Sequence, residues 1–218
     1  MMTSSNKKCL VLGIGGHAGV LTSIIDSNGE FEIIGLIDKF PEKIGQKIGK
    51  YSVIGQQKEL DNFLNKGLST IFIGIGDNKV RGDLFKYLKS IKCNIPALIH
   101  KSVMLETDFE IREGQQICIG AILSTGVSIG INTLINSGAI IDHESIIGQH
   151  CHISSGVTIT GKVEIGDYSF IGAASTVLPS VKVGRNTIVG AGSVVVNNLP
   201  DNVVAFGAPA KVRKENNI

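Results

Sequence analysis

An aliphatic residue recurs at every sixth position between residues 105 and 195. The sixteen residues of this series are Leu105, Ile111, Ile117, Leu123, Ile129, Ile135, Ile141, Ile147, Ile153, Ile159, Ile165, Ile171, Val177, Val183, Val189 and Val195. A period of six is not a multiple of 3.6, so an α-helix is excluded. The pattern predicts a solenoid in which three hexads form one triangular coil, and each aliphatic side chain stacks on its counterpart about 18 residues later.

The residues that flank this series indicate corners between flat sides. The position two before each aliphatic residue is mostly small or apolar, as at Ala121, Ser145 and Cys151. The position after it is often Gly, Asn or Asp, residue types that tolerate a positive φ. We therefore expect residues such as Gly130 and Asp142 to form the tight corners.

Residues 8–100 follow a different pattern, in which short apolar runs alternate with helix-like stretches. Strands are expected at 9–12, 32–37 and 70–75, and helices at 20–27, 56–65 and 79–91. Such alternation is typical of a small, doubly wound parallel sheet. The sequence thus predicts a Rossmann-like α/β domain at residues 1–100 and an all-β domain with a C-terminal tail at residues 101–218.

Composition argues against several classes of partner. The net charge is only +2, tryptophan is absent and aromatic residues make up 5% of the chain, so neither nucleic acid nor an anionic membrane is expected as a partner. No window has the roughly 18 apolar residues of a membrane span. The polar N-terminus does not resemble a signal peptide, and the four cysteines form no CxxC pair, so we expect a reduced, cytoplasmic protein.

Several motifs resemble those of a known family. Ile-Gly hexads such as 129–130, 147–148 and 165–166, with the closing segment 206–211, resemble the hexapeptide-repeat acyltransferases. The Gly-rich loop ending in Gly-His, with segments 37–39, 75–78 and 98–102, is similar to one subfamily: the nucleotide-sugar 4-amino N-acetyltransferases of bacillosamine- and perosamine-type pathways, which have sialic acid O-acetyltransferases as relatives. The resemblance covers residues 8–212.

This resemblance implies the fold, the substrates and the assembly. The repeats are expected to form a left-handed parallel β-helix, and the protein is expected to be a homotrimer. Acetyl-CoA is the expected co-substrate, without a metal. The acceptor is expected to be the 4-amino group of a UDP- or GDP-linked amino-dideoxy sugar, as used in surface glycan biosynthesis.

The first candidate binding site is the Gly-rich loop between the first strand and the first helix. Backbone N–H groups at such a turn can hold phosphate, but the spacing G-x-G-G-x-x-G departs from a dinucleotide fingerprint, and a tight structural turn would look the same. Asp38 ends the second strand, where it can meet a ribose or serve as an ordinary loop residue. The resemblance implies substrate-binding roles for Gly15, Gly16, His17, Asp38, Lys39 and Gly76.

The strongest chemical signal is the run Ile141-Asp142-His143-Glu144. With Ile141 pointing inward, His143 falls just past a corner and outside the coil. Acetyl transfer to an amine needs a base that titrates near neutrality, and a carboxylate beside an imidazole holds its tautomer. A solvated corner residue would look alike from these residues alone. The resemblance implies that His143 is the catalytic base and Glu144 its partner, with Asp142 as the second choice.

Further candidates concern acetyl-CoA and metal. The residues expected along an acetyl-CoA groove are His152, Gly161, Ala173, Gly190 and Ala191. Small residues let a pantetheine arm approach the backbone, although corner geometry alone also explains glycines. His143, His150 and His152 invite comparison with a three-histidine zinc site, which needs three ligands that converge on one open position. Two of them come from adjacent sides within one coil, and no further histidine follows along the repeats, so no metal is expected. No cysteine has an evident base partner, which favours direct transfer.

Two alternatives stay open at this level. The same histidine could deprotonate a hydroxyl, which would make the protein an O-acetyltransferase of a sialic or related nonulosonic acid. The β-helix could also serve only as a non-catalytic trimerising module.

Overall fold

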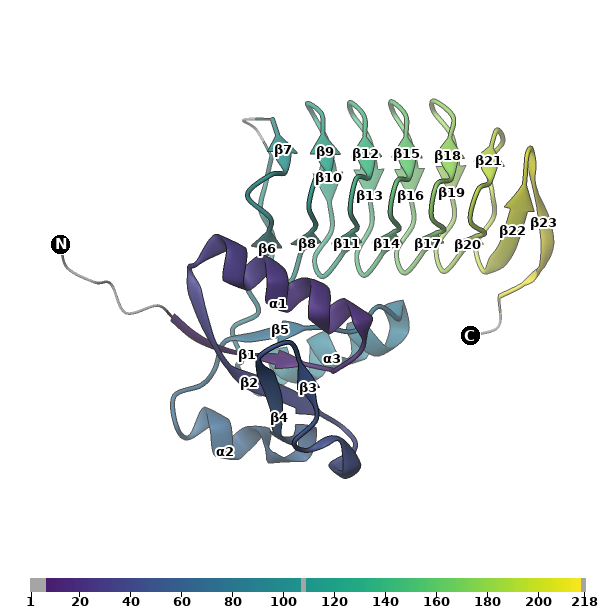
Figure 1. Cartoon of the computed structure of the whole chain (residues 1–218). Coiled ribbons are helices and arrows are strands. Elements are labelled where there is room, and N and C mark those ends of the chain that lie inside the picture. The colour runs from purple at the N-terminus through teal and green to yellow at the C-terminus, as the bar shows by residue number, and fades with distance from the viewer. Residues whose placement is uncertain (1–6, 107–108, 217–218) are drawn as a thin grey trace. The chain divides into compact units, whose positions relative to one another are not determined.

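The structure is a computed structural model, and it describes residues 7–106 and 109–216. The chain divides into two compact units, residues 1–100 and residues 101–218. Each unit is described by itself below, and both are drawn in Figure 1.

The first unit is a small α/β sandwich around a five-stranded sheet with strand order β3-β4-β2-β1-β5. The strands of this sheet are β1 (Lys7–Leu12), β2 (Phe31–Asp38), β3 (Lys47–Ile48), β4 (Tyr51–Gln56) and β5 (Ile71–Ile73). The unit also contains β6 (Leu98–Ile99), which lies outside this sheet, and the helices α1 (Gly16–Asn28), α2 (Leu60–Leu64) and α3 (Asn78–Ser90). β1, β2, β4 and β5 are parallel. Continuous apolar strands such as β1 and β5 are buried because helices cover a parallel sheet.

One local prediction for this unit differs from the structure, and one pair of strands was not predicted. The expected helix at 56–65 is a composite: β4 ends at Gln56, a 3₁₀ turn covers Gln57–Glu59, and α2 follows. The turn begins because the backbone N–H of Gln56 donates to Oε2 of Glu59 at 2.8 Å, forming a capping box. The short antiparallel pair β3–β4 was not expected, because two-residue β3 is too short to carry a periodic signal.

The second unit is a three-sided parallel β-helix made of two-residue strands (Figure 1). Side 1 contains β8 (Gln116–Ile117), β11 (Leu134–Ile135), β14 (His152–Ile153), β17 (Phe170–Ile171) and β20 (Ile188–Val189), and ends in β22 (Val203–Gly207) and β23 (Ala210–Glu215). Side 2 contains β7 (Met104–Leu105), β9 (Ile122–Leu123), β12 (Ile140–Ile141), β15 (Thr158–Ile159), β18 (Thr176–Val177) and β21 (Val194–Val195). Side 3 contains β10 (Ser128–Ile129), β13 (Ile146–Ile147), β16 (Glu164–Ile165) and β19 (Lys182–Val183).

Each strand pairs with the strand one coil later, in the register predicted from the period. Ile135 pairs with Ile153, and Ile153 with Ile171. From Ile117 onward, every member of the aliphatic series is at most 3% exposed and fills the interior. The predicted fold class is confirmed, because an α/β domain precedes a left-handed parallel β-helix of hexapeptide repeats.

The beginning of the aliphatic series differs from the prediction. Ile111 is 60% exposed and belongs to no strand, so it is not an interior residue. Strands follow one another at regular intervals of six residues only from β8 onward, which begins at Gln116. The six-residue repeat of aliphatic residues therefore begins earlier in the sequence than the regularly packed coils.

The corner geometry also differs from the prediction. The residues with positive φ lie three positions after the inward aliphatic residue, as at Gly126, Glu144 and Lys162, and not directly after it. The glycine directly after an aliphatic residue serves a different purpose. A Cβ on Gly130 would lie 2.6 Å from the backbone N of Gln149, so glycine is needed there because the next coil approaches closely.

Truncation of one interior side chain tests the dependence of the β-helix on its aliphatic series. Ile159→Ala should lower the free energy of unfolding by about 2–5 kcal/mol, because it opens a cavity between coils. Thr158→Ala, on the outer face of the same strand β15, is the matched control and should change it little. Urea unfolding followed by circular dichroism measures both; equal effects would contradict this account of the core.

Candidate active site

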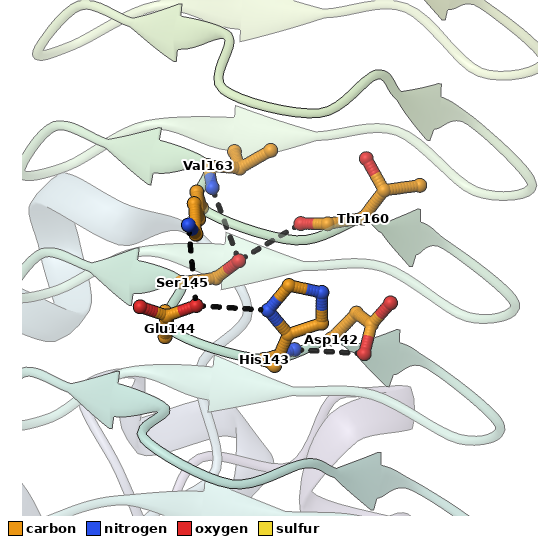
Figure 2. A network of polar contacts seen from close by, with 7 residues as sticks. Asp142, His143, Glu144, Ser145, Thr160 and Val163 are labelled. Atoms are coloured by element: carbon orange, nitrogen blue, oxygen red, sulfur yellow. Dashed lines mark hydrogen bonds and ion pairs between the residues drawn. The ribbon is translucent and has the colours of Figure 1, made fainter.

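His143 and Glu144 form a turn between β12 and β13, at the corner that joins side 2 to side 3 (corner 2/3). The next residue, Ser145, is fully buried and fastens this turn to the following coil. Its hydroxyl donates to the carbonyl of Thr160 at 2.8 Å and accepts from the backbone N–H of Val163 at 3.1 Å (Figure 2). The buried hydroxyl of Ser145 therefore holds in place the turn that carries the exposed His143.

The imidazole and the adjacent carboxylate form a hydrogen-bonded pair. Nδ1 of His143 lies 3.1 Å from Oε2 of Glu144, and the two side chains are 48% and 59% exposed (Figure 2). When Nδ1–H donates to this carboxylate, Nε2 keeps its lone pair available for a proton. The left-handed backbone of Glu144, with φ of 57°, turns its side chain back toward the ring.

Asp142, the second choice as partner of the imidazole, contacts the backbone of His143 in the structure. Its Oδ1 accepts the backbone N–H of His143 at 2.8 Å. The carboxylate therefore stabilises the turn, while Glu144 contacts the ring itself.

The charges at this corner favour an ionised Glu144. The hydrogen bond from His143, followed by the positive charge of Lys162, holds the pKa of Glu144 below its usual value. Nζ of Lys162 lies 3.6 Å from the same oxygen, Oε2. The imidazole thus has a charged acceptor at neutral pH.

Gly161 lies against the ring of His143 from the following coil. A Cβ at this position would lie 2.5 Å from both Nε2 and Cε1 of the imidazole, although the φ of Gly161 is not positive. The structure therefore brings together two residues that the sequence assigned to different roles. The missing side chain of Gly161 leaves room for the observed orientation of the imidazole.

The other residues expected along acetyl-CoA lie elsewhere on the β-helix. Ala173 and Ala191 occupy successive turns of the corner between sides 1 and 2 (corner 1/2), one coil apart, and both are exposed. Gly190 precedes the second turn, and a Cβ there would lie 2.8 Å from Cβ of Phe206. His152 lies on side 1, with its ring edge-on to Phe170. Within one chain, side 2 separates Ala173 and Ala191 from His143.

The candidate nucleotide-sugar residues follow the carboxyl ends of neighbouring parallel strands. Gly15, Gly16 and His17 come after β1, Asp38 and Lys39 end or follow β2, and Gly76 comes after β5. Because these strands are adjacent in the sheet, all six residues lie along one edge, where open α/β sheets bind ligands. Gly15, Gly16 and Gly76 have nothing within 4 Å of a Cβ position, so these glycines leave open space.

Arg81 is a site-forming residue that sequence reasoning missed. It lies on α3, is fully buried, and its guanidinium donates to the carbonyl of Gly76 at 2.9 Å and to Oδ1 of Asn78 at 2.9 Å. It therefore shapes the loop after β5. The only sequence signal was a charged residue on the buried face of a helix, which predicts a paired charge without naming the partner.

The three histidines considered for zinc lie on different parts of the coil. His150 is buried between sides 3 and 1, where Nδ1 lies 2.8 Å from the amide of Asn132 and the ring stacks on Tyr168. His143 and His152 lie at corner 2/3 and on side 1. Among residues 7–106 and 109–216, no group of three or more His, Cys, Asp or Glu side chains is arranged to hold a metal ion.

Comparison with known families gives two matches. Residues 8–88 match the family described as PglD N-terminal domain, and residues 162–197 match the bacterial transferase hexapeptide family (six repeats). No protein with curated annotation matches the chain in a sequence comparison.

Solved structures match almost the whole chain. A variant of perosamine N-acetyltransferase from Caulobacter crescentus, in complex with CoA and GDP-perosamine, is 31% identical with a TM-score of 0.91, over 97% of this chain and 99% of that one. The chain belongs to the hexapeptide-repeat acetyltransferase family of nucleotide-linked amino sugars. This acetyltransferase is also similar to PerB from Caulobacter crescentus, at 32% identity and a TM-score of 0.90, over 96% of this chain and 98% of that one.

A third similar structure contains the acetyl donor. The acetyltransferase domain of PglB from Neisseria gonorrhoeae FA1090, in complex with acetyl coenzyme A, is 26% identical with a TM-score of 0.88, over 96% of this chain and 100% of that one. Of the helices that the structure describes, none combines the length and the apolar character that a membrane crossing requires.

The contact between Gly161 and His143 can be tested by adding one methyl group. In Gly161→Ala, the exposed imidazole should swing away from the new Cβ, so the fold is retained while Nδ1 leaves Glu144. NMR spectra of the imidazole and thermal unfolding should therefore show a changed environment of the His143 ring with little loss of stability; an unchanged ring signal would contradict the orientation seen in the structure.

The four cysteines allow a test of the expectation that no thiol takes part in acetyl transfer. Cys9, Cys93, Cys118 and Cys151 are all buried, and burial raises the pKa of the Cys118 thiol to about 12. A protonated, inaccessible thiol is neither a nucleophile nor a target for alkylation. Iodoacetamide should leave these four cysteines of the native acetyltransferase unmodified and its activity intact, with full labelling only after unfolding; rapid native labelling with loss of activity would contradict this.

Proposed function

We propose that this acetyltransferase transfers the acetyl group of acetyl-CoA to the 4-amino group of a UDP- or GDP-linked amino-dideoxy sugar, in the biosynthesis of a surface glycan. The observation that carries the proposal is the His143–Glu144 pair, exposed at a corner of a β-helix whose family relatives bind CoA and GDP-perosamine. In this proposal the α/β unit holds the nucleotide and the β-helix holds acetyl-CoA.

In the proposed mechanism, His143 is the general base. Nε2 accepts a proton from the amine as its nitrogen attacks the thioester carbonyl and forms the new C–N bond. The tetrahedral intermediate then collapses, the C–S bond breaks, and the imidazolium returns the proton to the CoA sulfur. Glu144 holds Nδ1–H throughout and stabilises the imidazolium, because its carboxylate is ionised.

Two further groups assist this transfer. The backbone N–H of Gly161 is the proposed donor to the oxyanion, since Gly161 lies beside Nε2 of His143. His152, with Ala173, Gly190 and Ala191, is proposed to line the acetyl-CoA groove. Holding the amine and the thioester together supplies much of the rate, because it replaces an encounter in solution.

The division of these residues between two corners supports a homotrimer. His143 lies at corner 2/3, whereas Ala173 and Ala191 lie at corner 1/2, across side 2. A single CoA molecule can contact both sets if corner 1/2 of one subunit faces corner 2/3 of its neighbour. We therefore propose that the active site lies between subunits.

The proposed function predicts the behaviour of His143→Asn. Removing the base while keeping the size of the side chain should lower kcat by about 10²–10⁴-fold, with little change in the KM for acetyl-CoA. Release of the CoA thiol, assayed with UDP- and GDP-linked 4-amino sugars, measures this effect.

The choice of acceptor distinguishes the alternatives. A panel of UDP- and GDP-linked amino sugars should be acetylated on nitrogen, while free sialic acid should not react. Acetylation of the free acid alone would replace the proposal with O-acetylation. Unchanged CoA release in His143→Asn would instead favour a β-helix that only assembles subunits.

A further inference from the structure

Lys162 contacts both members of the His143–Glu144 pair. Its backbone N–H donates to the carbonyl of His143 at 2.9 Å, and its Nζ lies 3.6 Å from Oε2 of Glu144. Oε2 is also the atom that faces Nδ1 of His143. One carboxylate oxygen therefore lies between an imidazole and an ammonium group, in a row of three side chains.

The register of the β-helix accounts for this position. Lys162 occupies the same place as Glu144 in the following coil, and both residues have a left-handed backbone, with φ of 61° and 57°. This geometry turns two long side chains outward, one above the other. The coils before and after have Gly126 and Ser180 at the same place, and these side chains are too short for such a contact.

We propose that Lys162 is a positioning residue for acetyl transfer, whose ammonium group holds the Glu144 carboxylate against Nδ1 of His143. This inference rests on the proposed function, in which His143 is the base. The glutamate side chain is 59% exposed, so without a second partner it gains rotamer freedom. The imidazole then loses the acceptor that fixes its tautomer for part of the time.

The variants Lys162→Met and Lys162→Arg test the proposal in the full-length protein. Lys162→Met should lower kcat about 3- to 10-fold and leave both KM values unchanged. Lys162→Arg keeps the charge and should restore kcat. High salt should reduce the difference between Lys162→Met and the wild type, because the ion pair is exposed.

The chain offers a matched control one coil further along. Lys182 forms an equivalent exposed ion pair with Glu164 on side 3, at 2.8 Å, away from the imidazole. Lys182→Met should leave kcat unchanged. A double-mutant cycle then shows whether Lys162 acts through Glu144: in a Glu144→Gln background, Lys162→Met should cause no further loss of kcat.

An NMR measurement without substrates separates this inference from the proposed function. The imidazole ¹⁵N shifts of His143, assigned with His143→Asn, should report the tautomer with Nδ1–H in the wild type and a mixture of both tautomers in Lys162→Met. If the wild-type protein transfers no acetyl group, the proposed function fails, and an unchanged tautomer in Lys162→Met then overturns the inference as well. If transfer occurs, unchanged kcat in Lys162→Met overturns the inference whatever the tautomer does.

Discussion

The stacking of each aliphatic side chain on its counterpart one coil away is the constraint on which the rest of the β-helix depends. It fixes the register of every two-residue strand, as in the pairing of Ile141 with Ile159. Two-residue strands have too few hydrogen bonds to set a register alone. The buried series does so, because a slip by one residue would expose it and bury its polar neighbours.

The same register builds the candidate active site. Since corresponding turns repeat every coil, residues of successive turns at corner 2/3 lie beside one another, as 126, 144 and 162 do. Ser145 fastens one turn to the next through its hydroxyl, and related contacts recur at Ser169 and Ser175. A histidine in such a turn is held by backbone and buried hydroxyls, although the ring itself stays exposed.

The sequence was sufficient to predict the features that repeat and insufficient for those that depend on contacts between coils. The period of six predicts a three-sided solenoid and the outward position of His143, and the structure agrees. It does not predict that Ile111 lies outside the packed coils, because a single residue without paired neighbours carries the same signal. Nor does it identify Arg81, whose partners depend on how the loop after β5 folds.

Glycines illustrate this limit most clearly. Gly126, Gly130 and Gly161 lie three, one and two positions after a residue of the aliphatic series, and each is required for a different reason. Gly126 has a positive φ of 69°, Gly130 meets the backbone of the next coil, and Gly161 meets the ring of His143. The last contact joins residues 143 and 161, which lie one coil apart, so the neighbours of Gly161 in the sequence indicate only a turn.

The same separation explains why Lys162, an ordinary surface lysine by its neighbours in sequence, contacts the carboxylate of Glu144. In a β-helix, the environment of a corner residue is set by the coil above and the coil below, and a site residue is recognised by comparing positions one full coil apart.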